Sequence, residues 1–268
     1  MGVKLADWSY WHNQKRARKR LLGHPKKGSR AWFQRNRKRL PPGAVGSVMD
    51  YRQKLGSLGL KTVAYGSNVD LLNSKFNEIV NTVKALDCKY VVIYYGPCQS
   101  KEQVLQDAKT YNEIGKKLHA EGIQLCYHNH CQEFAKFDGE YGLDILFENT
   151  DPRYLAAQID VAWVTIGGED PAKFIHKYKG RCPLIHLKDF SKEIVTNVLN
   201  DPRLKGIWTE VGTGVVDFKS VLSAAQKAGV EWGSVEQDQL RDLPPHGKHQ
   251  SQYPKPEEAW GKVAHKSQ

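Results

Sequence analysis

The chain lacks long apolar runs, paired cysteines and a glycine-rich phosphate turn, and each absence excludes a class of protein. No apolar run approaches the roughly 18 residues of a membrane span, so we expect no membrane partner. The five cysteines include no Cys-x-x-Cys pair, which argues against a disulfide framework or a structural zinc site and favours a reducing, cytoplasmic location. With 40% hydrophobic residues over 268 positions, the sequence predicts a soluble globular protein with a sizeable core.

Acidic residues are missing from one long segment, and this accounts for the net charge of +11. Residues 8–49 hold twelve Lys or Arg and no Asp or Glu, while Lys4 and Asp7 cancel. Residues 50–268 therefore carry 11 minus 12, or −1. Because the positive charge is confined to this segment, we expect nucleic acid to be an unlikely partner of the remainder.

The basic segment shows neither strand alternation nor a sustained helical stripe, and we expect residues 1–43 to be anomalous. A disordered arm, a contact with nucleic acid or a membrane surface, a stretch of different origin and a targeting peptide all remain open. Strand one could lie at residues 2–5, strand two near 31–34 and a helix at 44–58. We expect residues 44–240 to form the main domain and 241–268 an irregular tail.

Beyond this segment, short apolar stretches alternate with helical periodicity, as repeating βα units require. Helices are expected at 70–86, 102–118, 170–180 and 217–229, with Asp170-Pro171 and Asp217 at two starts. Strands are expected to begin near Thr62, Val91, Ile123, Ala156, Leu184 and Gly233. This spacing predicts one α/β (β/α)8 TIM barrel that is incomplete or irregular around the second strand. A doubly wound sheet would need a glycine-rich turn after its first strand, and none is present.

Polar clusters follow four of the expected strands, at the strand ends where barrel enzymes hold their active sites. Oxygen and imidazole groups that arrive from separate strand ends can form an open site for a divalent metal. Within a strand, His128 and His130 share one face and should point together into the mouth. The clusters are residues 127–130 with Glu133, then Asp160, then residues 186–189, then residues 236–238.

In this order and spacing, the motifs resemble the sugar phosphate isomerase/epimerase family of xylose isomerase-like TIM barrels. The resemblance covers roughly residues 44–240. It rests on the runs LCYHNHCQEF at 125–134, DVAW at 160–163, GGEDP at 167–171, LIHLKD at 184–189, EVGTGVVDF at 210–218 and VEQD at 235–238.

The resemblance implies a divalent metal, most commonly Mn²⁺, with Mg²⁺, Co²⁺ or Zn²⁺ as alternatives. The family's usual Glu, Asp, His and Glu ligands match Asp160, His186 and Glu236. For the first ligand, either His128 binds directly or Glu133 folds back from its loop, and of the two we expect Glu133. Trp163 could wall a sugar pocket, and His128, Asn129 and Asp189 are the other expected substrate contacts.

A metal-polarised carbonyl makes the adjacent C–H acidic, and a nearby carboxylate or imidazole can then remove the proton. We therefore expect an isomerase or epimerase of a small sugar or keto-sugar. Glu133 and Glu236 would be the acid/base pair, and His130 and Lys188 would orient the substrate or stabilise an oxyanion. The alternatives are a dehydratase or lyase of the same family, an apurinic endonuclease-like enzyme, and a barrel that has lost activity. An oligomer is possible.

Overall fold

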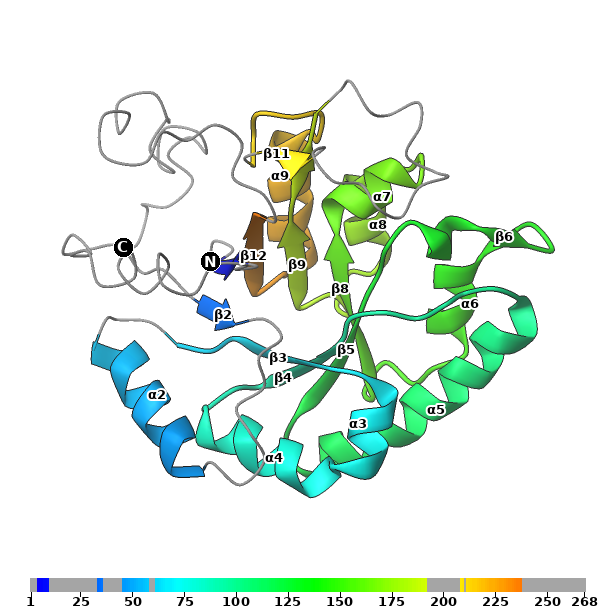
Figure 1. Cartoon of the computed structure of the whole chain (residues 1–268). Coiled ribbons are helices and arrows are strands. Elements are labelled where there is room, and N and C mark those ends of the chain that lie inside the picture. Colours follow the sequence, from blue (N-terminus) through cyan, green and yellow to red (C-terminus); the bar gives the residue numbers. More distant parts are fainter. Residues whose placement is uncertain are drawn as a thin grey trace, which may run out of the picture.

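The computed structural model describes residues 4–9, 33–35, 45–57, 61–191, 208–209 and 211–237, of which 4–9, 33–35, 45–47 and 237 are described by their backbone alone. Eight parallel strands form one curled sheet, and the helices lie along its outer side (Figure 1). The sheet order is β2-β1-β12-β9-β8-β5-β4-β3. The strands are β1 (Lys4–Ser9), β2 (Phe33–Arg35), β3 (Ala64–Ser67), β4 (Tyr90–Ile93), β5 (Gln124–His128), β8 (Leu155–Asp160), β9 (Leu184–Leu187) and β12 (Trp232–Gln237).

Followed around the ring, the strands of this sheet come in the order in which they occur along the chain, as in a TIM barrel. The first strand, β1, pairs with the last strand, β12, with Lys4 opposite Trp232. Among the described residues, every neighbouring pair around the ring is hydrogen-bonded except β2 and β3. The predicted (β/α)8 fold is confirmed, and the irregularity lies at the second strand, which has only three residues.

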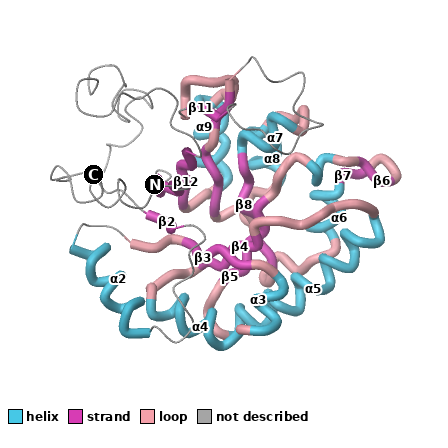
Figure 2. Tube along the Cα trace, in the orientation of Figure 1, coloured by secondary structure: helices cyan, strands magenta, loops and turns pink. Residues whose placement is uncertain are grey.

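The helices form an outer layer, which Figure 2 separates by colour from the strands inside. Two short antiparallel ribbons lie outside the main sheet: β6 (Lys136–Phe137) with β7 (Glu140–Tyr141), and β10 (Asp189–Phe190) with β11 (Trp208–Thr209). The helices are α2 (Val45–Ser57), α3 (Val69–Ser74), α4 (Phe76–Ala85), α5 (Lys101–Ala120), η1 (Gln132–Phe134, a 3-10 turn), α6 (Gly142–Glu148), α7 (Val161–Ile166), α8 (Pro171–Lys177) and α9 (Phe218–Ala228).

Two helix starts follow the predicted chemistry. Asp170 accepts from the amides of Ala172 and Lys173 ahead of Pro171, and Asp217 accepts from the amide of Ser220. These contacts satisfy amide groups that have no partner inside a first helical turn. Both predicted N-caps are therefore confirmed.

The helix expected at 70–86 is instead two helices, α3 and α4, which meet at Lys75. The Ser74 hydroxyl donates to the carbonyl of Asp70 at 2.6 Å. A serine that bonds back to the carbonyl four residues earlier competes with the helical ladder and bends it. The apolar periodicity continues across the break, so periodicity alone predicted a single helix.

Buried apolar residues form two clusters, one on each face of the sheet, and β4 and β8 are buried along their whole length. Within the described part of the chain, no helix combines the length and the apolar character that crossing a membrane would take. The predicted tail and most of the basic segment lie outside the described residues. The predicted division into segment, barrel and tail therefore stays a prediction, although β1 and β2 belong to the sheet.

Candidate metal centre and active site

The register of three neighbouring strands places the predicted site residues on one face at the carboxyl end of the sheet. His128 pairs with Gln158, and Asp160, two residues further along β8, pairs with His186. His186 in turn pairs with Ser234, two residues before Glu236. Because alternate residues of a strand share a face, His128, Asp160, His186 and Glu236 all project to the same side.

Three of these side chains present ligand atoms to one point. His128, Asp160 and His186 are buried, and their potential ligand atoms lie within 4.8 Å of one another. Asp160 Oδ2 is 3.3 Å from His186 Nδ1 and 3.8 Å from His128 Nε2. One carboxylate and two imidazoles are a donor set that suits divalent transition metals.

The two oxygens of Asp160 have different roles. Oδ1 accepts from the amides of Ala162 and Trp163, at 2.9 and 3.0 Å, and so caps α7. Oδ2 is buried and accepts no hydrogen bond from the described residues. A buried carboxylate oxygen without a hydrogen bond is costly unless a cation or a proton compensates it. The residues present therefore fit a bound dication.

Burial raises the pKa of Asp160 to about 8, although the charge of Lys188 and the amide of Trp163 act to lower it. Burial also lowers the pKa of His128 well below its usual value, and the neighbouring His186, His130 and Lys188 add to this effect. A neutral imidazole is the form that can ligate a metal. Without a cation, the site thus holds a neutral His128 beside a carboxyl group that readily takes a proton.

Gln158 orients the imidazole ring of His128. The sequence did not predict a role for this glutamine. Its Oε1 lies 3.2 Å from Nδ1 of His128. If Nδ1 carries the proton in this contact, Nε2 presents its lone pair towards Asp160. A single glutamine two residues before Asp160, in an otherwise apolar strand, was the available signal.

Glu236 lies beside the three-residue cluster, on the other side of His186. Its Oε2 is 3.4 Å from His186 Nε2 and accepts a hydrogen bond from Lys188 Nζ at 3.0 Å. Lys188 is 4% exposed, and its ammonium group lies 3.7 Å from the ring centre of Trp208. A buried carboxylate paired with a buried ammonium group is a candidate for proton transfer.

His130 and Trp163 form an aromatic wall next to the cluster. The His130 ring is 5.0 Å from that of His128 and 5.1 Å from that of Trp163, between ring centres. Trp163 is in turn 5.1 Å from Trp208. The rings of His128 and His130 therefore lie side by side, as expected, and the role of Trp163 in binding substrate stays a prediction.

Glu133 does not belong to the cluster of potential metal ligands formed by His128, Asp160 and His186. Its Oε1 accepts from the Tyr127 hydroxyl at 2.5 Å, and its Oε2 accepts from the amide of His130 at 2.9 Å. Burial raises the pKa of Glu133 to about 7, against the lowering effect of these hydrogen bonds. In this arrangement, Glu133 fixes the loop that carries His130.

Asn129 and Asp189, both predicted to bind substrate, make contacts to the backbone. Asn129 Oδ1 accepts from the amide of Asp160 at 3.0 Å and so links the ends of β5 and β8. Asp189 is fully buried and accepts from the amides of Phe190, Gly212, Gly214 and Val216. These contacts make Asp189 the anchor of the loop at 211–216, and its role in binding substrate stays a prediction.

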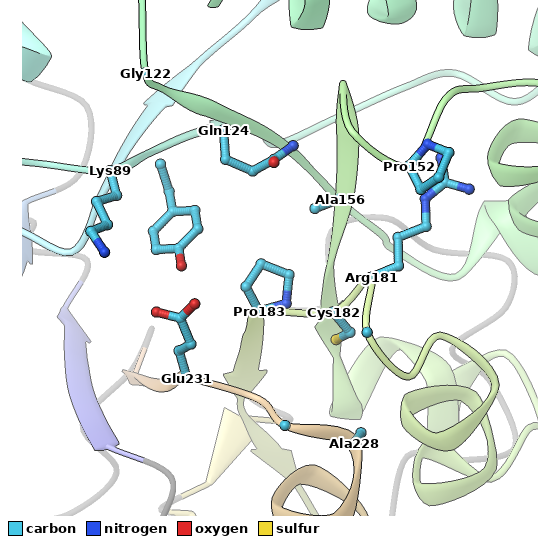
Figure 3. Close-up of a pocket in the computed structure, with 13 residues that line it drawn as sticks. Lys89, Gly122, Gln124, Pro152, Ala156, Arg181, Cys182, Pro183, Ala228 and Glu231 are labelled. Atoms are coloured by element: carbon cyan, nitrogen blue, oxygen red, sulfur yellow. The ribbon is translucent and has the colours of Figure 1, made fainter. Parts of the chain in front are cut away.

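A hollow of about 300 Å³ lies at the opposite end of the strands (Figure 3). Two cationic residues, Lys89 and Arg181, line it. Arg181 has a structural role, because it donates to the carbonyls of Phe147, Thr150 and Leu155 at 2.6 to 3.0 Å. The amino-terminal face of a barrel usually serves stability. The chemistry is therefore expected at the other end, around Asp160.

Comparison with known proteins agrees with this fold. The chain is 31% identical over 135 residues to an inosose dehydratase of Geobacillus thermodenitrificans, a match that covers 48% of this chain and 45% of that protein. The chain thus spans about half the length of the curated relatives it matches.

Solved structures share the fold at low sequence identity. A sugar phosphate isomerase/epimerase from Parabacteroides distasonis superposes with a TM-score of 0.71 at 18% identity, over 90% of this chain and 88% of that one. The IolI protein with a bound zinc atom gives 0.62 at 16% identity, over 87% and 88%. The sequence model of the Xylose isomerase-like TIM barrel family matches residues 73–260, more than half of the chain. The protein therefore belongs to the xylose isomerase-like TIM barrel family.

Proposed function

We propose that this protein is a metal-dependent dehydratase that removes water from a cyclic or open keto-polyol. The proposal rests on the position of Asp160 Oδ2, which faces His186 and His128 at the carboxyl end of the sheet. The Lys188–Glu236 ion pair lies beside it. The 31% identical relative is named for dehydration. This favours the dehydratase, which the sequence left as an alternative, over the isomerase or epimerase that we expected first.

His128, Asp160 and His186 would hold the divalent cation, with Glu236 near enough to His186 to join them. When bound, such a cation polarises a substrate carbonyl and makes the neighbouring C–H more acidic. His128 takes the first ligand position in place of Glu133, because Glu133 is engaged with Tyr127 and the amide of His130.

Glu236 would remove the proton from the carbon next to the carbonyl, with the ammonium group of Lys188 lying 3.0 Å from its carboxylate. The C–O bond at the following carbon would then break, and the departing hydroxide would take up the proton that Glu236 has accepted, while His130 would orient the departing group. A carbon–carbon double bond forms and one water leaves, so the atoms and charges balance. Trp163 would cover the ring and exclude other water.

The test is incubation of the full chain with Mn²⁺ and a panel of keto-polyols, beginning with inosose, in D₂O. Nuclear magnetic resonance should show a dehydrated product, and Glu236→Gln should abolish it. Deuterium at the carbon next to the carbonyl, with no loss of water, would replace the dehydratase by an isomerase or epimerase. If no keto-polyol of the panel shows either loss of water or uptake of deuterium, the proposed chemistry is wrong.

A further inference from the structure

A second hollow, of about 480 Å³, opens beside His130 at the carboxyl end of the sheet. Asn68 follows the end of β3, Tyr94 and Tyr95 follow the end of β4, and His130 follows the end of β5. Asp107 and Thr110 of α5 form its outer wall. The hollow thus lies on the face that carries the proposed chemistry, further around the ring of strands.

His130 is shared between the hollow and the metal centre. Its ring lies 5.9 Å from that of Tyr95 on one side and 5.0 Å from that of His128 on the other, between ring centres. A substrate that places its carbonyl at the cluster and continues past His130 would enter the hollow. The His130 ring thus lies between the hollow and the metal centre.

The lining has the chemistry of a site for hydroxylated rings. Tyr95 is 56% exposed, and with Met49 it is one of two exposed large hydrophobic side chains in the described part of the chain. Asn68 is already fixed, because its Oδ1 accepts from the amide of Leu71 at 2.9 Å and its Nδ2 donates to the Tyr94 hydroxyl at 3.4 Å. An aromatic face with a few fixed polar groups is typical of small-molecule sites.

The charge of the lining selects against an anion. Of the described residues that line the hollow, Asp70 and Asp107 are acidic and none is Lys or Arg. A phosphate would need cationic or amide donors here and would meet carboxylates instead. Carboxylates accept hydrogen bonds from neutral hydroxyl groups without this penalty.

We propose that this hollow is a subsite for a neutral, polyhydroxylated substituent, such as a second sugar ring, stacked on Tyr95 and attached to the ring that reacts at the metal centre. The inference rests on the proposed function for the reacting ring. It names the substrate class as a glycosylated keto-polyol and not a sugar phosphate.

The test compares inosose, its O-glucosyl derivative and its phosphate as substrates of the Mn²⁺-loaded full chain. The glucosyl derivative should exceed inosose in kcat/KM by about tenfold, the equivalent of one good stacking contact. Tyr95→Ala should abolish this ratio, whereas Tyr95→Phe, which keeps the ring, and Met49→Ala, a matched exposed control, should retain it. The phosphate should be a poorer substrate than inosose.

A binding experiment separates failure of the subsite from failure of the proposed reaction. Saturation transfer from the protein to methyl glucoside requires no turnover, and it should be present in the wild type and lost in Tyr95→Ala. If no keto-polyol reacts but the saturation transfer depends on Tyr95, the proposed subsite is supported and the proposed dehydration is rejected. An absent transfer, a glucosyl preference that ignores Tyr95, or a preference for the phosphate would overturn the subsite.

Discussion

Asp160 and His186 lie directly opposite each other on β8 and β9, and Oδ2 of Asp160 is 3.3 Å from Nδ1 of His186. The same carboxylate caps α7 through its other oxygen. One residue thus fixes the start of a helix and presents a buried oxygen to two imidazoles. The two roles can be separated by substitution.

Asp160→Asn keeps an oxygen for the amides of Ala162 and Trp163 but loses the negative charge. We expect metal binding and activity to be lost, while the unfolding midpoint of the metal-free protein stays close to that of the wild type. Asp160→Ala should lose the cap as well, with about 1 kcal/mol less stability. Metal analysis and thermal melting of the two variants check this, and an Asn variant that keeps both metal and activity would contradict it.

Lys188→Met should leave the metal in place and reduce turnover by roughly a hundredfold or more, because Glu236 and the developing charge lose their buried cation. Metal content and kcat are the two measurements. Lys75→Met is the matched control, since the exposed pair Lys75–Glu78 should contribute little. Equal activity of the two variants would remove Lys188 from the proposed chemistry.

Glu133 should make the stability of the protein depend on pH. Burial raises its pKa from the ordinary value of 4.5 to about 7 in the folded protein. Between these two pH values the folded state therefore binds more protons than the unfolded state. The free energy of unfolding should therefore fall as pH rises from about 4.5 to 7, by up to about 3 kcal/mol from this group. Denaturant unfolding of Glu133→Gln and wild type at several pH values checks this, and a difference that does not change with pH would refute it.

Gly214→Ala should weaken the loop that Asp189 anchors. A Cβ at position 214 would lie 2.2 Å from the carbonyl oxygen of Phe190 and 2.3 Å from Asp189 Oδ1. The backbone must shift to relieve these contacts, so we expect a clear drop in melting temperature. Gly56→Ala is the control, because its Cβ would meet nothing within 4 Å and alanine favours a helix interior. Similar melting temperatures for the two variants would show that the loop adapts freely.

Much of the fold could be predicted because it follows from local patterns. Apolar runs that end in charged residues predicted β5, β8, β9 and β12, and the aspartates before α8 and α9 predicted their starts. The break at Lys75 could not be predicted from periodicity, because the apolar positions continue across it. The second strand was expected near residues 31–34 and is found as β2 (Phe33–Arg35), although the basic stretch around it shows no strand alternation.

The site was predictable to the extent that it depends on strand register. His128, Asp160, His186 and Glu236 share a face because side chains alternate along each strand. The position of Glu133 depends on how its loop turns, and the buried hydroxyl of Tyr127 holds it there. The sequence gives no direct sign of that contact. Asp189 was equally ambiguous, because three of its four backbone partners lie 23 to 27 positions further along the chain.

The most direct test of the metal centre is calorimetric titration of Mn²⁺ into the metal-free full chain, with His128→Ala and Glu133→Gln beside the wild type. We expect one bound ion in the wild type and in Glu133→Gln, and none in His128→Ala. A His128→Ala protein that still binds the ion, together with a Glu133→Gln protein that does not, would contradict it.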